Sequence, residues 1–285
     1  MTLIGIKFIL KSKLMKLPYQ LDSFKKNGIL KIKNFLSQSE LDKIIKGVSP
    51  FKASKGEKNT YFSNNFKKNL FKLFKFQFSK FLISNYLIRL SKKKKMNQFA
   101  DLAFGKKSHL SIVDCYYSPI SDKEVLPWHV DQAYGGKKQI NDNEIVHHDQ
   151  FSIKFFIYLT KVGSNNGCTS YIPGTNQITY ALRKGIKEKK IRYSPHWLLK
   201  DLRNFVTKKE NLEYFNNYFK DLNVIKKFLE DTDFINTNPD HNKYDFEMSP
   251  GDMIIFDEGG VHKGSKILYN DRQVLRYHYS ITNLY

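Results

Sequence analysis

The chain has 285 residues and a mass of 33.6 kDa, and 41% of its residues are hydrophobic. A chain of this size can bury a sizeable core, and its 23 Phe and 17 Tyr residues exclude intrinsic disorder as a general description. Its formal net charge at pH 7 is +21, yet only six of the 48 basic residues are Arg, the residue that nucleic-acid readers favour. We interpret most of the charge as Lys on a solvated surface and do not expect a nucleic-acid partner. An anionic substrate, steered by the positive field, is the alternative.

Cysteine content and hydropathy indicate the compartment. Cys115 and Cys168 are the only cysteines, too few for a disulfide framework. Residues 1–16 mix Lys with apolar residues and lack the pattern of a secretory signal. No apolar run reaches the roughly 18–20 residues of a membrane span. These features predict a cytoplasmic protein without a membrane span, and they leave its oligomeric state open.

The N-terminal third has mixed helix and strand signals. A short helix is expected to end at Gly28, and the alternation of residues 29–35 predicts a strand. Ser37-Gln-Ser-Glu40 forms a capping box, which predicts a helix start. Phe and Leu recur at helical spacing over residues 66–90, which predicts a helix that packs on the core.

From residue 108 the hydrophobic period changes to two. Short segments rich in Ile, Val, Phe, Tyr and Thr predict strands at 109–118, 151–160, 168–173, 252–257 and 272–281. Many short strands with turn signals favour a β-sandwich or barrel over a parallel α/β sheet. Residues 178–235 return to helical spacing, and residues 236–243 read as a loop.

Pro127-Trp-His129-Val-Asp131 is the strongest local signal for a site. A His-x-Asp at a strand end places an imidazole and a carboxylate on one face, where both can bind one metal ion. A second His would complete a 2-His-1-carboxylate triad, the ligand set of non-haem Fe(II) oxygenases. His147-His-Asp149 repeats the pattern, but it lies in a polar turn where solvated side chains are expected. We therefore favour His129 and Asp131.

The second His is expected at the end of the segment 249–262. Gly251-Asp252 turns into a buried strand that ends in glycines and delivers His262. If the strands 252–257 and 272–281 are antiparallel neighbours, Arg272 lies near His262 and could hold a carboxylate bidentately. Arg276, four residues further along the same strand, is the alternative anchor.

Three ordered blocks give the chain a specific resemblance. They are Trp128-His-Val-Asp131, Asn165-Asn-Gly-Cys-Thr-Ser-Tyr-Ile-Pro-Gly-Thr175, and Gly251-Asp through His262 to Arg272-Gln-Val-Leu. With these blocks the chain resembles the phytanoyl-CoA dioxygenase-like family of Fe(II)/2-oxoglutarate-dependent oxygenases. The resemblance covers most of residues 20–282 apart from an insert near 178–247.

The resemblance implies a mainly β fold, a double-stranded β-helix (jelly roll, cupin-like) with flanking and inserted α-helices. It implies His129, Asp131 and His262 as the catalytic iron ligands and Arg272 as the anchor of the 2-oxoglutarate C5 carboxylate. The implied cofactors are Fe(II), 2-oxoglutarate as cosubstrate and O2; a ferryl oxidant would form, with release of succinate and CO2. Since Asp131 is present, hydroxylation is favoured over halogenation.

Further site residues follow from the same resemblance. The family often has a small hydroxyl residue two places after the distal His; here that place is Gly264, with Ser265 next. Phe156 is the candidate aromatic wall of the 2-oxoglutarate pocket, and Tyr116 could reach the same pocket or pack in the core.

Three residues of the His-x-Asp segment are candidates for substrate contacts. Gln132 and Tyr134 directly follow Asp131 and could point at the substrate. Trp128 could form a wall for the substrate or simply pack behind the metal.

We therefore expect one oxygenase domain over residues 1–285. Its parts are an N-terminal flank at 17–107, a jelly-roll core at 108–177 and 246–285, and a helical lid inserted at 178–245. The expected activity is hydroxylation of a small metabolite that could carry a carboxylate, phosphate, CoA or nucleotide group. Desaturation or oxidative cleavage with the same cofactors is the nearest alternative. A non-catalytic basic jelly-roll binding module and a cupin-like enzyme with another metal are the others.

Overall fold

The computed structural model describes residues 17–51, 59–64, 76–131 and 152–281. The helices are α1 (Leu17–Asn27), α2 (Gln38–Val48), the 3₁₀ turn η1 (Ser49–Phe51), α3 (Phe76–Lys93), α4 (Met96–Phe104), α5 (Thr175–Lys187), α6 (Leu199–Val206), α7 (Lys209–Tyr218) and α8 (Asn223–Thr237). The strands are β1 (Ile29–Ile32), β2 (Asn59–Asn64), β3 (His109–Ser118), β4 (Leu126–His129), β5 (Ser152–Tyr158), β6 (Thr169–Tyr171), β7 (Asp245–Phe246), β8 (Met253–Asp257), β9 (His262–Gly264) and β10 (Arg272–Ser280). The five strands expected from the period of two are all present.

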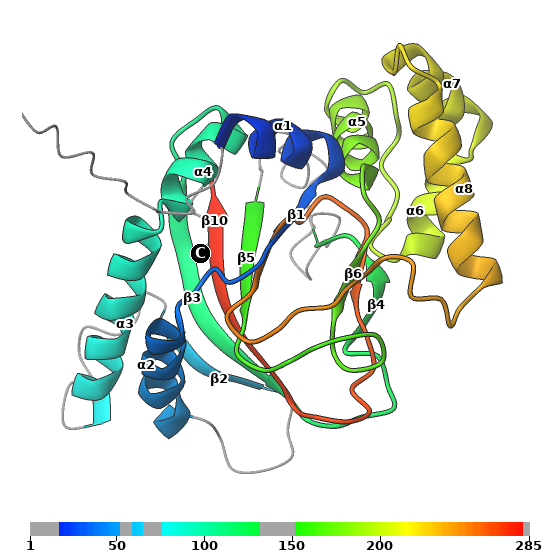
Figure 1. The fold of residues 1–285 in the computed structure, drawn as a ribbon. Helices are drawn as coiled ribbons and strands as arrows, with labels where there is room; N and C mark the ends of the chain where they lie inside the picture. Colours follow the sequence, from blue (N-terminus) through cyan, green and yellow to red (C-terminus); the bar gives the residue numbers. More distant parts are fainter. Residues whose placement is uncertain (1–16, 52–58, 65–75, 132–151, 282–285) are drawn as a thin grey trace, which may run out of the picture.

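Two antiparallel sheets face each other and form the jelly roll (Figure 1). The larger sheet has the order β1-β8-β5-β10-β3-β2, and the smaller has the order β4-β9-β6-β7. Apolar side chains of both sheets, such as Phe156, Tyr171 and Phe256, fill part of the space between them. The expected double-stranded β-helix is therefore confirmed.

The strand order corrects one expectation. β8 and β10 are not neighbours, because β5 lies between them and pairs with both. His262 also lies outside the larger sheet, on the short strand β9 of the smaller one. His262 and Arg272 therefore belong to opposite sheets and line the same cavity between them, and they are not neighbours along one hairpin.

Alternation along the central strands separates the core from the interior of the jelly roll. On β10, Leu275, Tyr277 and Tyr279 belong to the core under α1–α4, while Arg272 and Arg276 face the other way, into the jelly roll. Figure 1 shows these helices at the outer side of the larger sheet. α2 starts with the expected capping box, since the Ser37 hydroxyl accepts from the Glu40 N–H and the Glu40 carboxylate accepts from the Ser37 N–H.

Helices α5 to α8 form a separate layer at the other side of the molecule (Figure 1). Their apolar faces share a core that reaches the smaller sheet through Val130, Ile172 and Val261. Since Val130 lies between His129 and Asp131, the helical insert packs directly behind the site segment.

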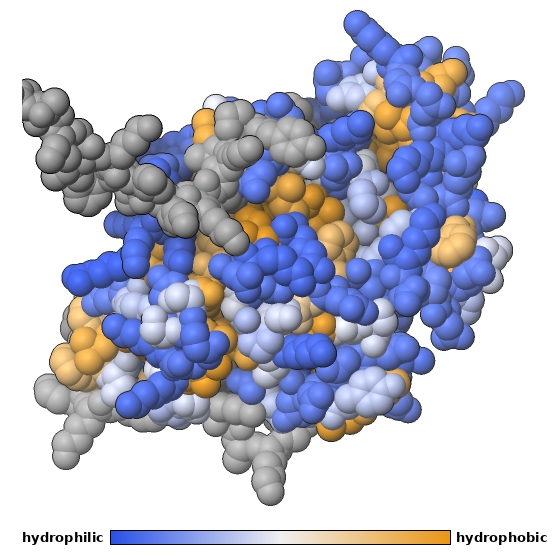
Figure 2. Space-filling model, in the orientation of Figure 1, coloured by the Kyte–Doolittle hydropathy of each residue, from blue (hydrophilic) through white to orange (hydrophobic). Residues whose placement is uncertain are grey.

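The surface of the described residues is mainly hydrophilic, in agreement with the Lys-rich composition. Figure 2 shows hydrophilic residues over most of the visible face, including the helical insert, with apolar residues in smaller areas. Both cysteines are buried, and no disulfide joins them. Within the described ranges, no helix is long and apolar enough to span a membrane.

Candidate metal centre

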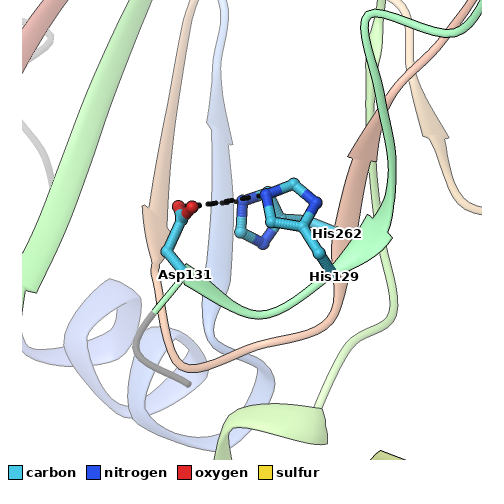
Figure 3. A group of neighbouring side chains, drawn as sticks. All are labelled: His129, Asp131 and His262. Atoms are coloured by element: carbon cyan, nitrogen blue, oxygen red, sulfur yellow. Dashed lines mark ion pairs between the residues drawn. The ribbon is translucent and has the colours of Figure 1, made fainter. Parts of the chain in front are cut away.

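Two short strands bring two imidazoles together. β4 pairs antiparallel with β9, and His129 lies directly opposite His262 in this register. Their ring centroids are 4.3 Å apart, and both side chains are buried. Asp131 follows two residues after His129 and turns its carboxylate toward both rings (Figure 3). One potential ligand atom from each of the three residues lies within 4.8 Å of the others.

Backbone carbonyls define the tautomer of each ring. Nδ1 of His129 is 2.7 Å from the Pro127 carbonyl oxygen, and Nδ1 of His262 is 2.9 Å from that of Gly260. A carbonyl only accepts, so each Nδ1 carries the proton and donates it. In the neutral rings Nε2 is therefore an electron-pair donor, and each Nε2 points at Asp131.

This arrangement fits a divalent metal ion. Nε2 of His129 lies 3.3 Å from Asp131 Oδ1, and Nε2 of His262 lies 3.2 Å from Asp131 Oδ2. Nε2 of His129 is buried without a hydrogen-bond partner. Burial lowers the pKa of His262, which favours its neutral form. Three electron-pair donors that face one another need a cation between them, and two imidazoles with one carboxylate are the set that suits non-haem Fe(II).

The Asp131 carboxylate is held in its ionised form. Burial raises its pKa, but the Lys154 ammonium, the strongest opposing group, helps to hold the pKa well below its usual value. Lys154 Nζ lies 2.5 Å from Asp131 Oδ2 and 2.8 Å from Glu258 Oε1. The candidate ligand is thus tied to a second buried carboxylate through a lysine.

A cavity of about 160 Å³ opens beside the triad, between the two sheets. Four basic side chains line it, and three of them have carboxylate partners. Lys154 pairs with Asp131 and Glu258, Lys263 with Glu124 at 2.9 Å, and Arg276 with Asp114 through two hydrogen bonds of 2.9 and 2.6 Å. Among the described residues, Arg272 pairs with no carboxylate.

Arg272 is therefore the cation left for an anionic ligand. Its side chain is buried, and its Nε has no hydrogen-bond partner. Its guanidinium carbon lies 5.9 Å from the ring centroid of Phe156 and 6.0 Å from that of Tyr158. The Tyr158 hydroxyl shares a hydrogen bond of 2.8 Å with the hydroxyl of Thr169, a cavity-lining residue on β6. A guanidinium beside two hydroxyls is suited to a carboxylate.

The residues expected around 2-oxoglutarate divide into two groups. Phe156 and Tyr116 both line the cavity, and their rings lie edge to face with centroids 6.3 Å apart. Arg276 lies 4.7 Å over the Tyr116 ring, and burial raises the pKa of Tyr116 to about 12. Ser265 is not among the lining residues; its hydroxyl lies 3.4 Å from Cys168 Sγ.

Gly264 on β9 occupies the position where the family often has a small hydroxyl residue. A Cβ on Gly264 would lie 2.8 Å from Cβ of Val125, so no side chain fits there. Across the sheet, Gly264 pairs with Thr169, whose hydroxyl group is present at this part of the cavity. The neighbouring strand thus has a hydroxyl-bearing residue, Thr169, directly opposite Gly264.

The residues expected at the substrate are less well placed. Trp128 does not line the cavity; it packs against the helical insert, with His241 at 6.2 Å and Tyr244 at 6.3 Å between ring centroids. This position corresponds to the alternative in which Trp128 packs behind the metal. Gln132 and Tyr134 lie outside the described residues, as do His147 and Asp149 of the rival motif.

Lys154 and Thr169 were missed by the sequence interpretation. A charged residue in the middle of the apolar strand Ser152–Tyr158 was a usable signal, because alternation places Lys154 on the face of Phe156. Thr169 has no comparable signal, since Thr is ordinary in a strand.

A jelly roll that brings two histidines and one aspartate together beside a buried arginine with no carboxylate partner in the described part of the chain is typical of non-haem iron oxygenases that use 2-oxoglutarate. The family model described as "Phytanoyl-CoA dioxygenase (PhyH)" matches residues 24–268. The chain therefore belongs to the phytanoyl-CoA dioxygenase family and to its class of Fe(II)/2-oxoglutarate-dependent oxygenases, as the resemblance implied. A search of curated protein sequences found no match.

Solved structures share the fold at low sequence identity. The epimerase SnoN, in complex with Fe3+, alpha-ketoglutarate and nogalamycin RO, has a TM-score of 0.51 and 12% identity over 92% of this chain and 82% of its own. The carbocyclase SnoK has a TM-score of 0.53 and 12% identity, with coverage of 94% and 84%. HygX from Streptomyces hygroscopicus with iron bound has a TM-score of 0.53 and 14% identity, with coverage of 93% and 87%. HygX has also been solved with nickel and 2-oxoglutarate.

Proposed function

We propose that this chain is a dioxygenase that uses Fe(II), 2-oxoglutarate and O2 to hydroxylate a small-molecule substrate. In this proposal His129, Asp131 and His262 hold the metal, and Arg272 binds the C5 carboxylate of 2-oxoglutarate. The observation that carries it is the pairing of two features in one cavity: three electron-pair donors that need a cation, and one buried arginine that needs an anion.

The bound Fe(II), with 2-oxoglutarate and O2, would supply an oxidant that inserts oxygen into a C–H bond and would leave succinate and CO2 as coproducts. The residues of the chain orient and protect this chemistry. Backbone carbonyls hold both imidazoles with Nε2 toward the metal position. Arg272 fixes the far end of the cosubstrate, with the Thr169 hydroxyl as a further donor. Phe156 and Phe256 give the cavity apolar walls that exclude water.

The helical insert, residues 175–237, packs behind His129 through Val130 and contributes none of the residues that line the cavity. The substrate is therefore proposed to contact side chains of the jelly roll itself. Tyr116, Val125 and Leu126 offer apolar contact surface in the cavity. Since three of the four lining cations are paired with carboxylates, we assign the remaining one to 2-oxoglutarate and not to an anionic substrate.

Another reaction outcome is the second candidate. The structural neighbours SnoN and SnoK are an epimerase and a carbocyclase, so this fold supports outcomes other than hydroxylation. Product analysis separates them: hydroxylation adds one oxygen atom to the substrate, while desaturation or cyclisation removes two hydrogens and epimerisation leaves the mass unchanged.

An anaerobic titration tests the cofactor assignment. Fe(II) and then 2-oxoglutarate are added to the metal-free protein while the weak visible charge-transfer band of the chelate is monitored. Appearance of the band, and its loss in Arg272→Met, is the expected result. Iron binding without the band contradicts the 2-oxoglutarate pocket and favours another metalloenzyme. Absence of metal binding favours the non-catalytic basic binding module.

A further inference from the structure

Lys154 is a charged residue in the interior of an otherwise apolar strand. It lies on β5 between the inward-facing Ser152 and Phe156, and it is only 9% exposed. Its ammonium lies between the carboxylates of Asp131 and Glu258, so a buried lysine is directed at a candidate metal ligand.

The contact continues as a buried chain of polar groups. Nζ of Lys154 lies between Asp131 Oδ2 at 2.5 Å and Glu258 Oε1 at 2.8 Å, and Glu258 Oε1 lies 3.3 Å from Nε2 of His278. Burial raises the pKa of Glu258, but His278 and Lys154 outweigh it and lower the pKa. Glu258 therefore gives the Lys154 ammonium a second buried carboxylate partner, opposite Asp131.

The two oxygens of Asp131 are consequently not equivalent. Oδ2 accepts the hydrogen bond from Lys154, whereas Oδ1 has no such donor among the described residues. A carboxylate with one oxygen engaged by an ammonium cannot turn freely, and such outer partners govern how a ligand meets its metal. The 2-His-1-carboxylate site works only if positions remain open for the cosubstrate and oxygen.

We propose that Lys154 is a positioning residue that keeps Asp131 from using both oxygens on the metal, so that 2-oxoglutarate can still bind there. Glu258 holds Lys154 in place for this purpose. This inference rests on the proposed function, because it assumes that the triad binds a metal. A positioning role of Lys154 differs in one respect from that of a purely stabilising ion pair: its loss impairs cosubstrate binding more than metal binding.

The test measures two affinities on the intact protein without turnover. Ni(II), and then 2-oxoglutarate on the Ni(II)-loaded protein, are titrated calorimetrically into wild type, Lys154→Met and Lys154→Arg. We expect Lys154→Met to weaken 2-oxoglutarate binding by about 10-fold or more, the size typical of outer partners of metal ligands. Its Ni(II) affinity should change by a smaller factor, and Lys154→Arg should recover most of the 2-oxoglutarate affinity.

Lys94→Met is the matched control, since Lys94 forms a partly buried ion pair with Glu40 at 2.7 Å, in the helical layer outside the larger sheet. It should leave both affinities unchanged. If Lys154→Met does not fold, the double variant Lys154→Met with Glu258→Gln, which removes both buried charges, carries the same expectation. Equal losses of the two affinities, or 2-oxoglutarate binding at the wild-type level, would overturn the inference. Failure of the wild type to bind Ni(II) and 2-oxoglutarate would instead overturn the proposed function.

Discussion

Gly167 lies directly against the side chain of Arg272. A Cβ on Gly167 would be 2.8 Å from Cδ of Arg272 and 3.1 Å from its Cβ, closer than side-chain atoms pack. Gly167 also has a φ of +74°, a conformation that other residues adopt at a cost. The glycine of the Asn165-Asn-Gly-Cys block therefore makes room for the proposed 2-oxoglutarate anchor.

Gly167→Ala should impair both stability and cosubstrate binding. Gly105→Ala is the matched control, because Gly105 has a φ of +64° but nothing within 4 Å of an added Cβ. The left-handed conformation alone should cost the control about 1–2 kcal/mol of unfolding free energy. Overpacking against Arg272 should cost Gly167→Ala about 1–3 kcal/mol more. Urea denaturation measures both costs.

The variants Gly167→Ala and Gly105→Ala also separate the effect of the backbone conformation from the effect of the contact with Arg272. Titration of the metal-loaded variants with 2-oxoglutarate should show weaker binding for Gly167→Ala and wild-type binding for Gly105→Ala. Equal behaviour of the two variants in both measurements would mean that the contact with Arg272 has no consequence.

Arg272 and Arg276 should respond to substitution in opposite ways. Arg272→Met removes a buried cation that has no carboxylate partner among the described residues, so the metal-free protein should be as stable as wild type or more stable. Its affinity for 2-oxoglutarate should fall about 10- to 150-fold, which corresponds to the 1.5–3 kcal/mol of charged hydrogen bonds. Metal affinity should change little.

Arg276→Met instead leaves the buried Asp114 carboxylate without its bidentate partner. Breaking such a pair should cost about 3–5 kcal/mol of stability, with a smaller effect on 2-oxoglutarate affinity than Arg272→Met. Thermal unfolding and 2-oxoglutarate titration of both variants decide which of the two arginines binds the C5 carboxylate of 2-oxoglutarate. A larger loss of 2-oxoglutarate affinity in Arg276→Met would move the anchor to that residue.

Each of the three ligand candidates should be required for metal binding. His129→Ala, Asp131→Ala and His262→Ala should each lose metal affinity by at least the roughly 100-fold upper range seen for outer partners, because a ligand itself is removed. Circular dichroism should show a retained fold. His147→Ala tests the rival His-x-Asp motif and should bind metal like the wild type. Metal binding that survives in Asp131→Ala but is lost in His147→Ala would relocate the site.

Local patterns account for what the sequence predicted well. The strand expected at 109–118 is β3 residue for residue, because alternation and turn residues act over a few positions. His129, Asp131 and His262 meet as expected, since each lies at a strand end with its own turn signal. The order of strands was not predictable in the same way: β5 separates β8 from β10 through pairings between segments about a hundred residues apart. The charge balance in the cavity depends on those pairings, so the ion pair of Arg276 with Asp114 and the contact of Lys154 with Asp131 emerged only from the structure.

Asp257 introduces an unusual pH dependence at the junction of β8 and the helical insert. Its carboxylate is buried, accepts hydrogen bonds from the Tyr180 hydroxyl and the Gly259 N–H, and lies beside the charges of Arg183 and Glu258. Burial raises the pKa of Asp257 to about 6, and the hydrogen bonds and Arg183 only partly offset this. In an unfolded chain the pKa of an Asp is about 3.9.

The sign of the effect follows from proton binding. Between pH 4 and 6 the folded protein holds a proton on Asp257 that the unfolded chain has released. The stability from this group is therefore full below about pH 4 and is lost as the pH rises through 6. Asp257→Asn does not titrate, so its unfolding free energy minus that of wild type should increase by roughly 2–3 kcal/mol from pH 4 to pH 7.5.

Denaturation of both proteins in urea across this pH range measures the difference, and the titrations of all other groups cancel in it. Tyr180→Phe sharpens the test, because the Tyr180 hydroxyl lowers the pKa of Asp257 and its removal should shift the transition to higher pH. A difference between Asp257→Asn and wild type that stays constant with pH would show that Asp257 is ionised in the folded protein throughout. The hydrogen bonds from Tyr180 and Gly259 and the charge of Arg183 would then fully offset the effect of burial on the pKa of Asp257.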